Sequence, residues 1–214
     1  MTTEQHPLAE RLSDTVSSAL TEGGMAWLWP PLLRLLARGH PVTADELATA
    51  TGHSTDEVRH ALAALPDAEY DEHGRLVGYG LTQRATPHRF TVDGQQLYTW
   101  CALDTLLFPA VLDRPAEVES PCHTTTTPVR LTVEPDKVVD VEPADAVVSI
   151  VTPGQCTSVR SDFCDQVHFF ASPEAAQPWL AEHPGATVLP VAEAFTLGHQ
   201  LAEQHRSTDT PDCC

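Results

Sequence analysis

Cys101, Asp104 and Cys164 are the residues of this chain whose types and spacing point to the most distinctive chemistry. On a helix, the spacing of Cys101 and Asp104 would put both side chains on one face, one turn apart. A thiol and a carboxylate so arranged can exchange a proton directly. Thiols are also the preferred ligands of soft metals. Together with Cys164, far downstream, the pair therefore predicts soft-metal binding coupled to proton transfer.

These residues depend on a helix and two strands for their positions. The helix carrying Asp104 is expected over Ala102–Val111, broken near Pro109, where proline removes a backbone donor. A strand over Gln95–Trp100 leads into it, and Cys164 precedes a strand expected over Gln166–Ala171. The remaining elements expected in this half are strands over His88–Val92, Val129–Val133, Val138–Val141, Ala146–Val151 and Thr187–Leu189, and helices over Pro173–Glu182 and Val191–Gln204.

The first part of the chain has the pattern of a winged helix. Helices are expected over Leu8–Leu20 and Trp27–Ala37, followed by two capping signatures, at Thr43 with Glu46 and at Ser54 with Glu57. A hairpin over Glu69–Tyr79 follows the second. The helix over Ser54–Leu65 would be the recognition helix of a DNA-binding protein. It begins with acidic residues, however, whereas base recognition needs Arg, Lys, Asn or Gln near the start, so we expect no nucleic-acid binding.

Charge and targeting features predict a cytoplasmic protein that binds neither nucleic acid nor membranes. The chain has 214 residues with 12 basic against 30 acidic, a net charge of −18, which opposes binding to nucleic acid or to anionic membranes. No apolar run has the length of a membrane span, and the first residues lack a secretory signal. In a reducing cytoplasm the six cysteines favour metal binding or catalysis over disulfides.

Several stretches of the chain together resemble the organomercurial lyase, or alkylmercury lyase, family. They are Glu69–Asp71, Gly78–Thr82, Leu97–Leu106, Phe108–Ala110, Val141–Ala144 and Phe163–Cys164 leading into Val167–Ser172. Their order and spacing match the family, from about residue 25 to about residue 205. The resemblance implies an α+β fold, in which an N-terminal winged-helix-like module (residues 1–80) is attached to a catalytic core of antiparallel strands with flanking helices (81–206). The last residues, 207–214, are expected to form a mobile tail, as chain ends commonly do.

The resemblance implies that Cys101, Cys164 and Asp104 cut the carbon–mercury bond of an organomercurial, releasing the hydrocarbon and Hg(II). It implies a structural role for Cys122 and no organic cofactor, with cellular thiols helping to remove the product. The same chemistry follows from the residues. Each thiolate that binds mercury donates electron density, weakens the Hg–C bond and makes the carbon more basic. Asp104 can take the thiol proton and deliver it to that carbon.

Several alternatives stay open. Trp100 and Phe163 each precede a thiol and either shape a pocket for the organic group or are ordinary core aromatics. Asp165 occupies a position where some relatives carry a second cysteine, and strand alternation would point it away from Cys164. The tail Cys213-Cys214 either hands Hg(II) to a partner such as mercuric reductase or is incidental. The alternative function is a thiol-based mercury or metal sensor that uses the winged helix on DNA.

Overall fold

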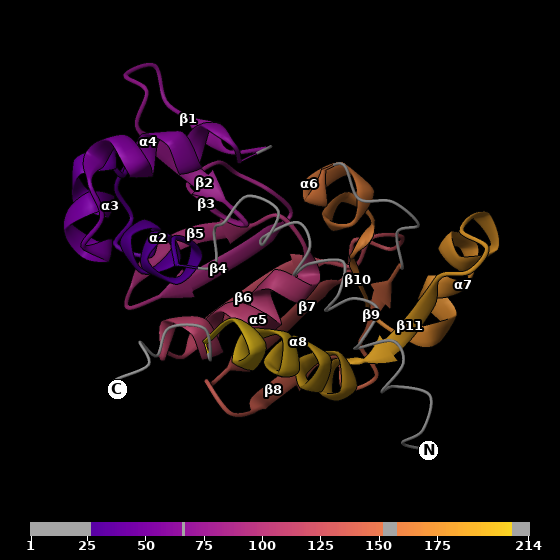
Figure 1. Ribbon diagram of the computed structural model, residues 1–214. Coiled ribbons are helices and arrows are strands. Elements are labelled where there is room, and N and C mark those ends of the chain that lie inside the picture. Colours follow the sequence, from indigo (N-terminus) through magenta and orange to yellow (C-terminus); the bar gives the residue numbers. More distant parts are fainter. Residues whose placement is uncertain (1–26, 66, 152–157, 207–214) are drawn as a thin grey trace.

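The computed structural model describes residues 27–65, 67–151 and 158–206. In this part of the chain, an N-terminal group of helices joins a long antiparallel sheet, and a smaller sheet lies at the other end (Figure 1). The predicted helix Leu8–Leu20, Cys156 and the predicted mobile tail 207–214 lie outside the described residues. Among the residues that are described, no helix is both long enough and apolar enough to cross a membrane.

Three short helices form the N-terminal group, namely α2 (Trp29–Leu36), α3 (Ala44–Thr51) and α4 (Thr55–Ala63). Both predicted capping boxes are confirmed. The Thr43 hydroxyl accepts from the Glu46 backbone N–H at 3.2 Å, while the Glu46 carboxylate accepts from the Thr43 backbone N–H at 2.8 Å. Ser54 and Glu57 make the same two contacts at the start of α4. These contacts satisfy N–H groups that have no partner within the helix, and so fix where α3 and α4 begin.

The main sheet has eight antiparallel strands in the order β1-β2-β3-β5-β4-β6-β7-β8. They are β1 (Glu69–Tyr70), β2 (Leu76–Tyr79), β3 (Leu81–Thr82), β4 (His88–Val92), β5 (Gln95–Thr99), β6 (Ala116–Pro121), β7 (Pro128–Val133) and β8 (Val138–Glu142). The predicted N-terminal hairpin is confirmed as β1 and β2. It continues into the core, because Gly78 pairs with Thr82 on β3 and Leu81 pairs with Thr99 on β5. The predicted boundary at residue 80 thus falls between two paired strands; as a division into separate units it stays a prediction.

Helix α5 (Ala102–Leu112) lies at the centre of the fold. It contacts strands β4 to β7, and it also packs against α8 (Val191–Arg206) and α2. Every residue of α5 except Asp104 is buried. The predicted break near Pro109 is wrong, since the helix runs on to Leu112. A proline inside a helix costs about 3 kcal/mol, but each large apolar side chain that is buried contributes about 1.5–3 kcal/mol, and α5 buries several.

The smaller sheet has the strand order β10-β9-β11, and helix α7 packs against it. These elements are β9 (Val147–Ile150), β10 (Phe169–Phe170), α7 (Pro173–Glu182) and β11 (Thr187–Pro190). The predicted Ser172 cap is present, because its hydroxyl accepts from the Ala175 backbone N–H at 3.3 Å. The predicted α+β fold class, with a winged-helix-like module and an antiparallel core, is confirmed.

One strand prediction is wrong. The strand expected over Gln166–Ala171 is only the two-residue β10, and Cys164–Gln166 forms a 3₁₀ helix, η1. The Val167 carbonyl there accepts from the Ala102 backbone N–H rather than from a strand. Strand β6 was not predicted, since its inward side chains are small and its outward ones include two glutamates, which strands disfavour.

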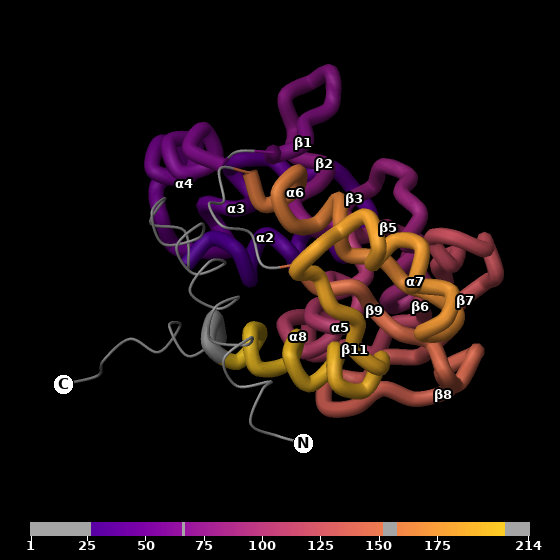
Figure 2. The backbone as a smooth tube through the Cα atoms, turned by 90° about the vertical axis from the view of Figure 1, so that its right-hand side faces the viewer, coloured from indigo at the N-terminus to yellow at the C-terminus, as the bar shows by residue number. Residues whose placement is uncertain are grey.

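A short helix, α6 (Val159–Asp162), precedes η1 and was not predicted. In both views of the backbone, α6 lies beside the N-terminal module (Figures 1 and 2). The Ser158 hydroxyl, at the start of α6, donates to the Asp67 carboxylate of that module at 2.8 Å. The segment leading to Cys164 is therefore tied to a part of the chain that is distant in sequence.

Candidate active site

Cys101 lies where β5 ends and α5 begins. It is the residue before the first turn of α5, with an extended backbone (φ −142°, ψ 170°), and its side chain is fully buried. The Thr99 hydroxyl donates to the Cys101 carbonyl at 2.8 Å. Just before it, the Trp100 backbone N–H donates to the Gly80 carbonyl at 2.8 Å, which continues the pairing of β3 with β5. The thiol is therefore held on a rigid strand-to-helix junction.

Asp104 lies in the first turn of α5, as predicted. Its carboxylate accepts from the Cys101 backbone N–H at 3.2 Å, which places the carboxylate over the start of the helix. Helix N-termini stabilise negative charge. Even so, burial raises the pKa of Asp104 to about 7. Near neutral pH this carboxyl group can therefore both accept and release a proton.

Cys164 belongs to a different segment of the chain, where it is the first residue of η1, and its side chain is buried. Its sulfur, the Cys101 sulfur and a carboxylate oxygen of Asp104 all lie within 4.8 Å of one another. Among the residues that the structure describes, no other group of three or more His, Cys, Asp or Glu side chains lies close enough to hold a metal ion. The structure thus brings together the three residues that the sequence singled out.

The pKa values of both thiols are raised, which favours their protonated forms near neutral pH. The hydrogen bond with Cys101 and burial raise the pKa of Cys164 well above its ordinary value. Burial also raises the pKa of Cys101. An uncharged pair of thiols beside one carboxyl group suits an enclosed apolar site, because unpaired charges are costly there. Each thiol must then lose its proton when it binds a metal.

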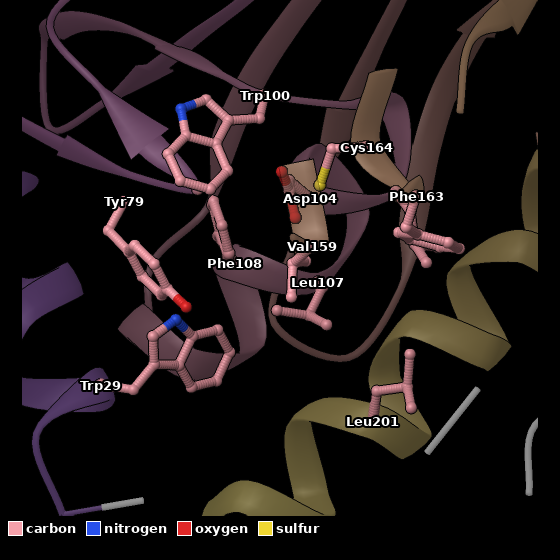
Figure 3. A pocket seen from close by; sticks show the side chains of 12 residues that line it. Trp29, Tyr79, Trp100, Asp104, Leu107, Phe108, Val159, Phe163, Cys164 and Leu201 are labelled. Atoms are coloured by element: carbon pink, nitrogen blue, oxygen red, sulfur yellow. The ribbon is translucent and has the colours of Figure 1, made fainter. Parts of the chain in front are cut away.

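An apolar pocket with an empty volume of about 640 Å³, part of it open to solvent, leads to these groups (Figure 3). Its wall is formed by Trp29, Tyr79, Gly80, Trp100, Leu103, Asp104, Leu107, Phe108, Val159, Phe163, Cys164 and Leu201. In Figure 3 the sulfur of Cys164 and the carboxylate of Asp104 lie together, with Trp100 on one side and Phe163 on the other. Cys101 is fully buried and is not part of the wall, whereas Cys164 and Asp104 are.

Trp100 and Phe163 lie in the pocket wall and also belong to the buried hydrophobic core, so their positions fit both alternatives left open by the sequence. A role in holding the organic group stays a prediction. Sequence reasoning missed most of the other lining residues. Trp29 from α2 and Leu201 from α8 come from opposite ends of the chain, and no local pattern marks them. Gly80 did carry a signal, as a glycine between two short strands. Its φ is +73°, and a Cβ atom there would lie 2.8 Å from the Phe108 ring.

Cys122 lies away from this site. It is buried in a second hydrophobic cluster with Phe170 and Trp179, next to the smaller sheet. Although burial alone would raise it, the pKa of Cys122 is lowered to about 7 by hydrogen bonds, among them those from Thr125 and Thr124. This position agrees with a structural role, which stays a prediction.

Asp165 lies on η1 rather than on a strand, so the prediction from strand alternation used the wrong element. Its side chain is nevertheless exposed. Its negative charge contributes to the raised pKa of Cys164, as the last of several causes. His168 stacks on His123 at 3.9 Å between ring centroids, and neither joins the group around Cys101.

Comparison with known proteins decides the family. Residues 81–203 match the sequence model of alkylmercury lyase, and residues 7–80 match that of the helix-turn-helix domain of alkylmercury lyase. The chain belongs to the alkylmercury lyase family. The resemblance noted in the sequence is therefore confirmed, and the predicted enzyme class with it.

Individual alkylmercury lyases resemble this chain over nearly its whole length. That of Streptomyces lividans is 62% identical over 210 residues, which cover 96% of this chain and 98% of the relative. That of Pseudomonas putida is 46% identical over 196 residues, which cover 92% of each chain. A solved structure described as the mercury-bound form of MerB2 has a TM-score of 0.74 at 25% identity, covering 92% of this chain and 99% of that chain. Nothing in these comparisons favours the alternative function, a mercury sensor.

Proposed function

We propose that Cys101, Cys164 and Asp104 break the carbon–mercury bond of organomercurials by protonolysis. The observation that supports this most directly is the meeting of two sulfurs and one carboxylate within 4.8 Å at an apolar pocket. Two thiolates can hold one mercury atom, and the carboxyl group is close enough to move a proton between sulfur and carbon. The predicted roles of all three residues are thus compatible with a single mercury centre.

Cys164 is the first thiol that the substrate meets, because it lies in the pocket wall while Cys101 does not. The organomercurial arrives bound to a small thiol. The sulfur of Cys164 replaces that thiol on mercury, and the proton of Cys164 leaves with it. The organic group then lies against the aromatic wall formed by Trp100, Tyr79 and Phe163. This wall excludes water from the Hg–C bond.

Cys101 binds next, and Asp104 takes its proton. Mercury then carries two thiolates and the organic group, which bears more negative charge at carbon than before. The protonated Asp104 delivers its proton to that carbon, the Hg–C bond breaks, and the hydrocarbon leaves. Hg(II) stays on the two sulfurs, and Asp104 is again a carboxylate. A pKa of about 7 suits this relay, because a proton carrier works best when its pKa is near the operating pH.

The product is then removed by cellular thiols, which exchange with the two cysteines. Mercuric reductase in the cytoplasm is the expected acceptor of the ion, and no organic cofactor takes part. The winged-helix-like module has no role on DNA in this proposal. Its helix α4 has acidic residues, Asp56 and Glu57, in the first turn and offers only Arg59 and His60 as cationic candidates for DNA contacts.

The test is turnover of phenylmercury or methylmercury with excess thiol, followed as benzene or methane in the headspace. We expect Cys101→Ser, Cys164→Ser and Asp104→Asn each to lose at least about a hundredfold in kcat, the range usual for a lost proton-transfer group. A sensor would bind the organomercurial stoichiometrically and release no hydrocarbon. Wild-type turnover in either serine variant would overturn the proposed roles.

A further inference from the structure

Glu69, on strand β1 of the N-terminal module, is a buried carboxylate outside the group that binds mercury. Only 6% of its surface is exposed. A buried carboxylate needs ionic or hydrogen-bonding partners, since an unpaired charge inside a protein costs several kcal/mol. Its partners show what it positions.

One carboxylate oxygen of Glu69 is directed at two residues of the active site region. Glu69 Oε1 accepts from the indole Nε1–H of Trp100 at 3.2 Å and also forms an ion pair with Arg160. The Arg160 guanidinium lies over the Trp100 ring, 4.9 Å from its centroid. Glu69 and Arg160 thus hold Trp100 at its edge and at its face, and Trp100 forms part of the pocket wall.

The other oxygen fixes the carboxylate in the sheet. Glu69 Oε2 accepts from the Thr82 hydroxyl at 2.5 Å. A Cβ atom on Gly78, which pairs with Glu69 across β1 and β2, would lie 2.5 Å from this same oxygen. Glycine at that position therefore leaves the space in which the carboxylate lies. Each oxygen of the Glu69 carboxylate therefore has its own partners inside the protein, unlike the single solvent-exposed contact of a typical surface ion pair.

Arg160 belongs to α6, one short turn before Cys164. The same end of α6 is held by Asp67, whose carboxylate accepts from the Ser158 hydroxyl at 2.8 Å. Asp67 lies between α4 and the main sheet, and Glu69 is the first residue of the strand that follows, β1. This segment of the N-terminal module thus holds the start of the segment that delivers the second thiol.

We propose that Glu69 is a positioning residue for the lyase reaction, which holds Trp100 in the pocket wall and, through Arg160, holds Cys164 within reach of Cys101. This inference rests on the proposed roles of the two cysteines. It gives the N-terminal module a direct part in the reaction. Loosening the contact would let Cys164 move away from Cys101, so that mercury would be held by one thiol for more of the time.

The test compares Glu69→Gln with Glu119→Gln as a matched control. Glu119 also pairs with arginines, Arg89 and Arg130, but on the exposed face of the sheet. We expect Glu69→Gln to lower kcat about ten- to a hundredfold, the loss usual for misplaced reacting groups, with KM changed less than about twofold. Retention of Hg(II) against a competing dithiol should fall about tenfold or more, because a two-thiol chelate then becomes partly one-thiol. The control should match the wild type in all three measurements.

Arg160→Gln tests the same interaction from the other partner. The Arg160 side chain is partly exposed, so we expect this substitution to leave the fold intact. Its losses should resemble those of Glu69→Gln, and the double variant should lose little more, because both changes remove one interaction. A lowered melting temperature with unchanged kcat and unchanged Hg(II) retention would show that Glu69 is only structural and would overturn the inference. Failure of the proposed function would instead appear as turnover in Cys101→Ser, measured on the same substrate.

Discussion

The backbone N–H of Ala102 donates to the carbonyl of Val167 at 3.0 Å. This single hydrogen bond joins the residue after Cys101 to the end of the short 3₁₀ segment that begins with Cys164. The two thiols are therefore linked through rigid backbone as well as through their own contact. Reacting groups must be held within fractions of an ångström, and backbone junctions do this better than long side chains.

We expect Asp104 to set the pH dependence of the reaction. Its pKa is raised to about 7 by burial, and it must be ionised to take the proton of Cys101. We expect kcat/KM to rise with pH through about 7 and then to level off, until the thiols begin to ionise. The measurement is a pH–rate profile with phenylmercury from pH 5 to pH 8.5. A profile that is flat across this range would contradict the relay.

The same group affects stability. The pKa of Asp104 is raised to about 7 in the folded protein, whereas an Asp in an unfolded chain has a pKa near 3.9. Between these values the unfolded chain has released its proton and the folded protein keeps it, so the free energy of unfolding falls as pH rises from about 4 to about 7. Asp104→Asn removes this penalty. We expect this variant to exceed the wild type in melting temperature by more at pH 8 than at pH 5, although we also expect it to lose activity.

The difference in access between the two thiols predicts different behaviour of the serine variants. Cys164 lies in the pocket wall, whereas Cys101 is fully buried and is not part of the wall. Cys101→Ser should still capture one equivalent of phenylmercury at close to the wild-type rate and then release no benzene. Cys164→Ser should capture it at least about tenfold more slowly. Stopped-flow capture with mass spectrometry of the adduct checks this, and equal capture rates would argue against Cys164 acting first.

Gly80 is required by its backbone and by its neighbour. With φ at +73° and Phe108 within 2.8 Å of a new Cβ atom, Gly80→Ala should lower the free energy of unfolding by about 1–3 kcal/mol, as expected for strain of this kind. Gly52→Ala is the matched control, because that glycine also has positive φ (+74°) but has open space around it. Denaturant unfolding should show the larger loss at Gly80, and only Gly80→Ala should also lower activity.

We expect Leu201 to limit the size of the organic group that the pocket accepts. It reaches the pocket from α8, at a distance from the sulfur in the close view (Figure 3). Leu201→Phe should lower kcat/KM for phenylmercury about tenfold while changing that for methylmercury little, since overfilling a packed site costs about 1–3 kcal/mol. Leu201→Met, of similar volume, is the control. Equal losses for both substrates in Leu201→Phe would show a general disturbance rather than selection by size.

Local patterns in the sequence were sufficient to predict part of the fold and part of the site. The spacing of Cys101 and Asp104 predicted that they share one helical face, and the hairpin and capping boxes were equally local. The break predicted at Pro109 was wrong because burial of α5 on all sides outweighs the lost hydrogen bond. The strand predicted after Cys164 was wrong because the Val167 carbonyl bonds to α5 instead.

Other features depend on contacts between distant segments. Residue types suggested that Cys164 joins Cys101 and Asp104 at one metal, and the resemblance to a family strengthened this, but no local pattern could show how the fold brings the two thiols together. Glu69 and Arg160 are charged residues in ordinary surroundings when only the sequence is considered, and nothing nearby marks them as partners. Their pairing exists only because the main sheet brings β1 next to Trp100, while α6 lies against the N-terminal module.

The main sheet passes without interruption from the N-terminal hairpin to the strand that ends beside Cys101. A shortened protein beginning at residue 81 would therefore leave β3 without its neighbour and expose a line of unpaired backbone groups. Such edges pair readily with other chains. We expect a cut between the two sequence-defined parts to yield a self-associating fragment whose thiol site has lost its support, so catalysis would require the N-terminal module as well as the core.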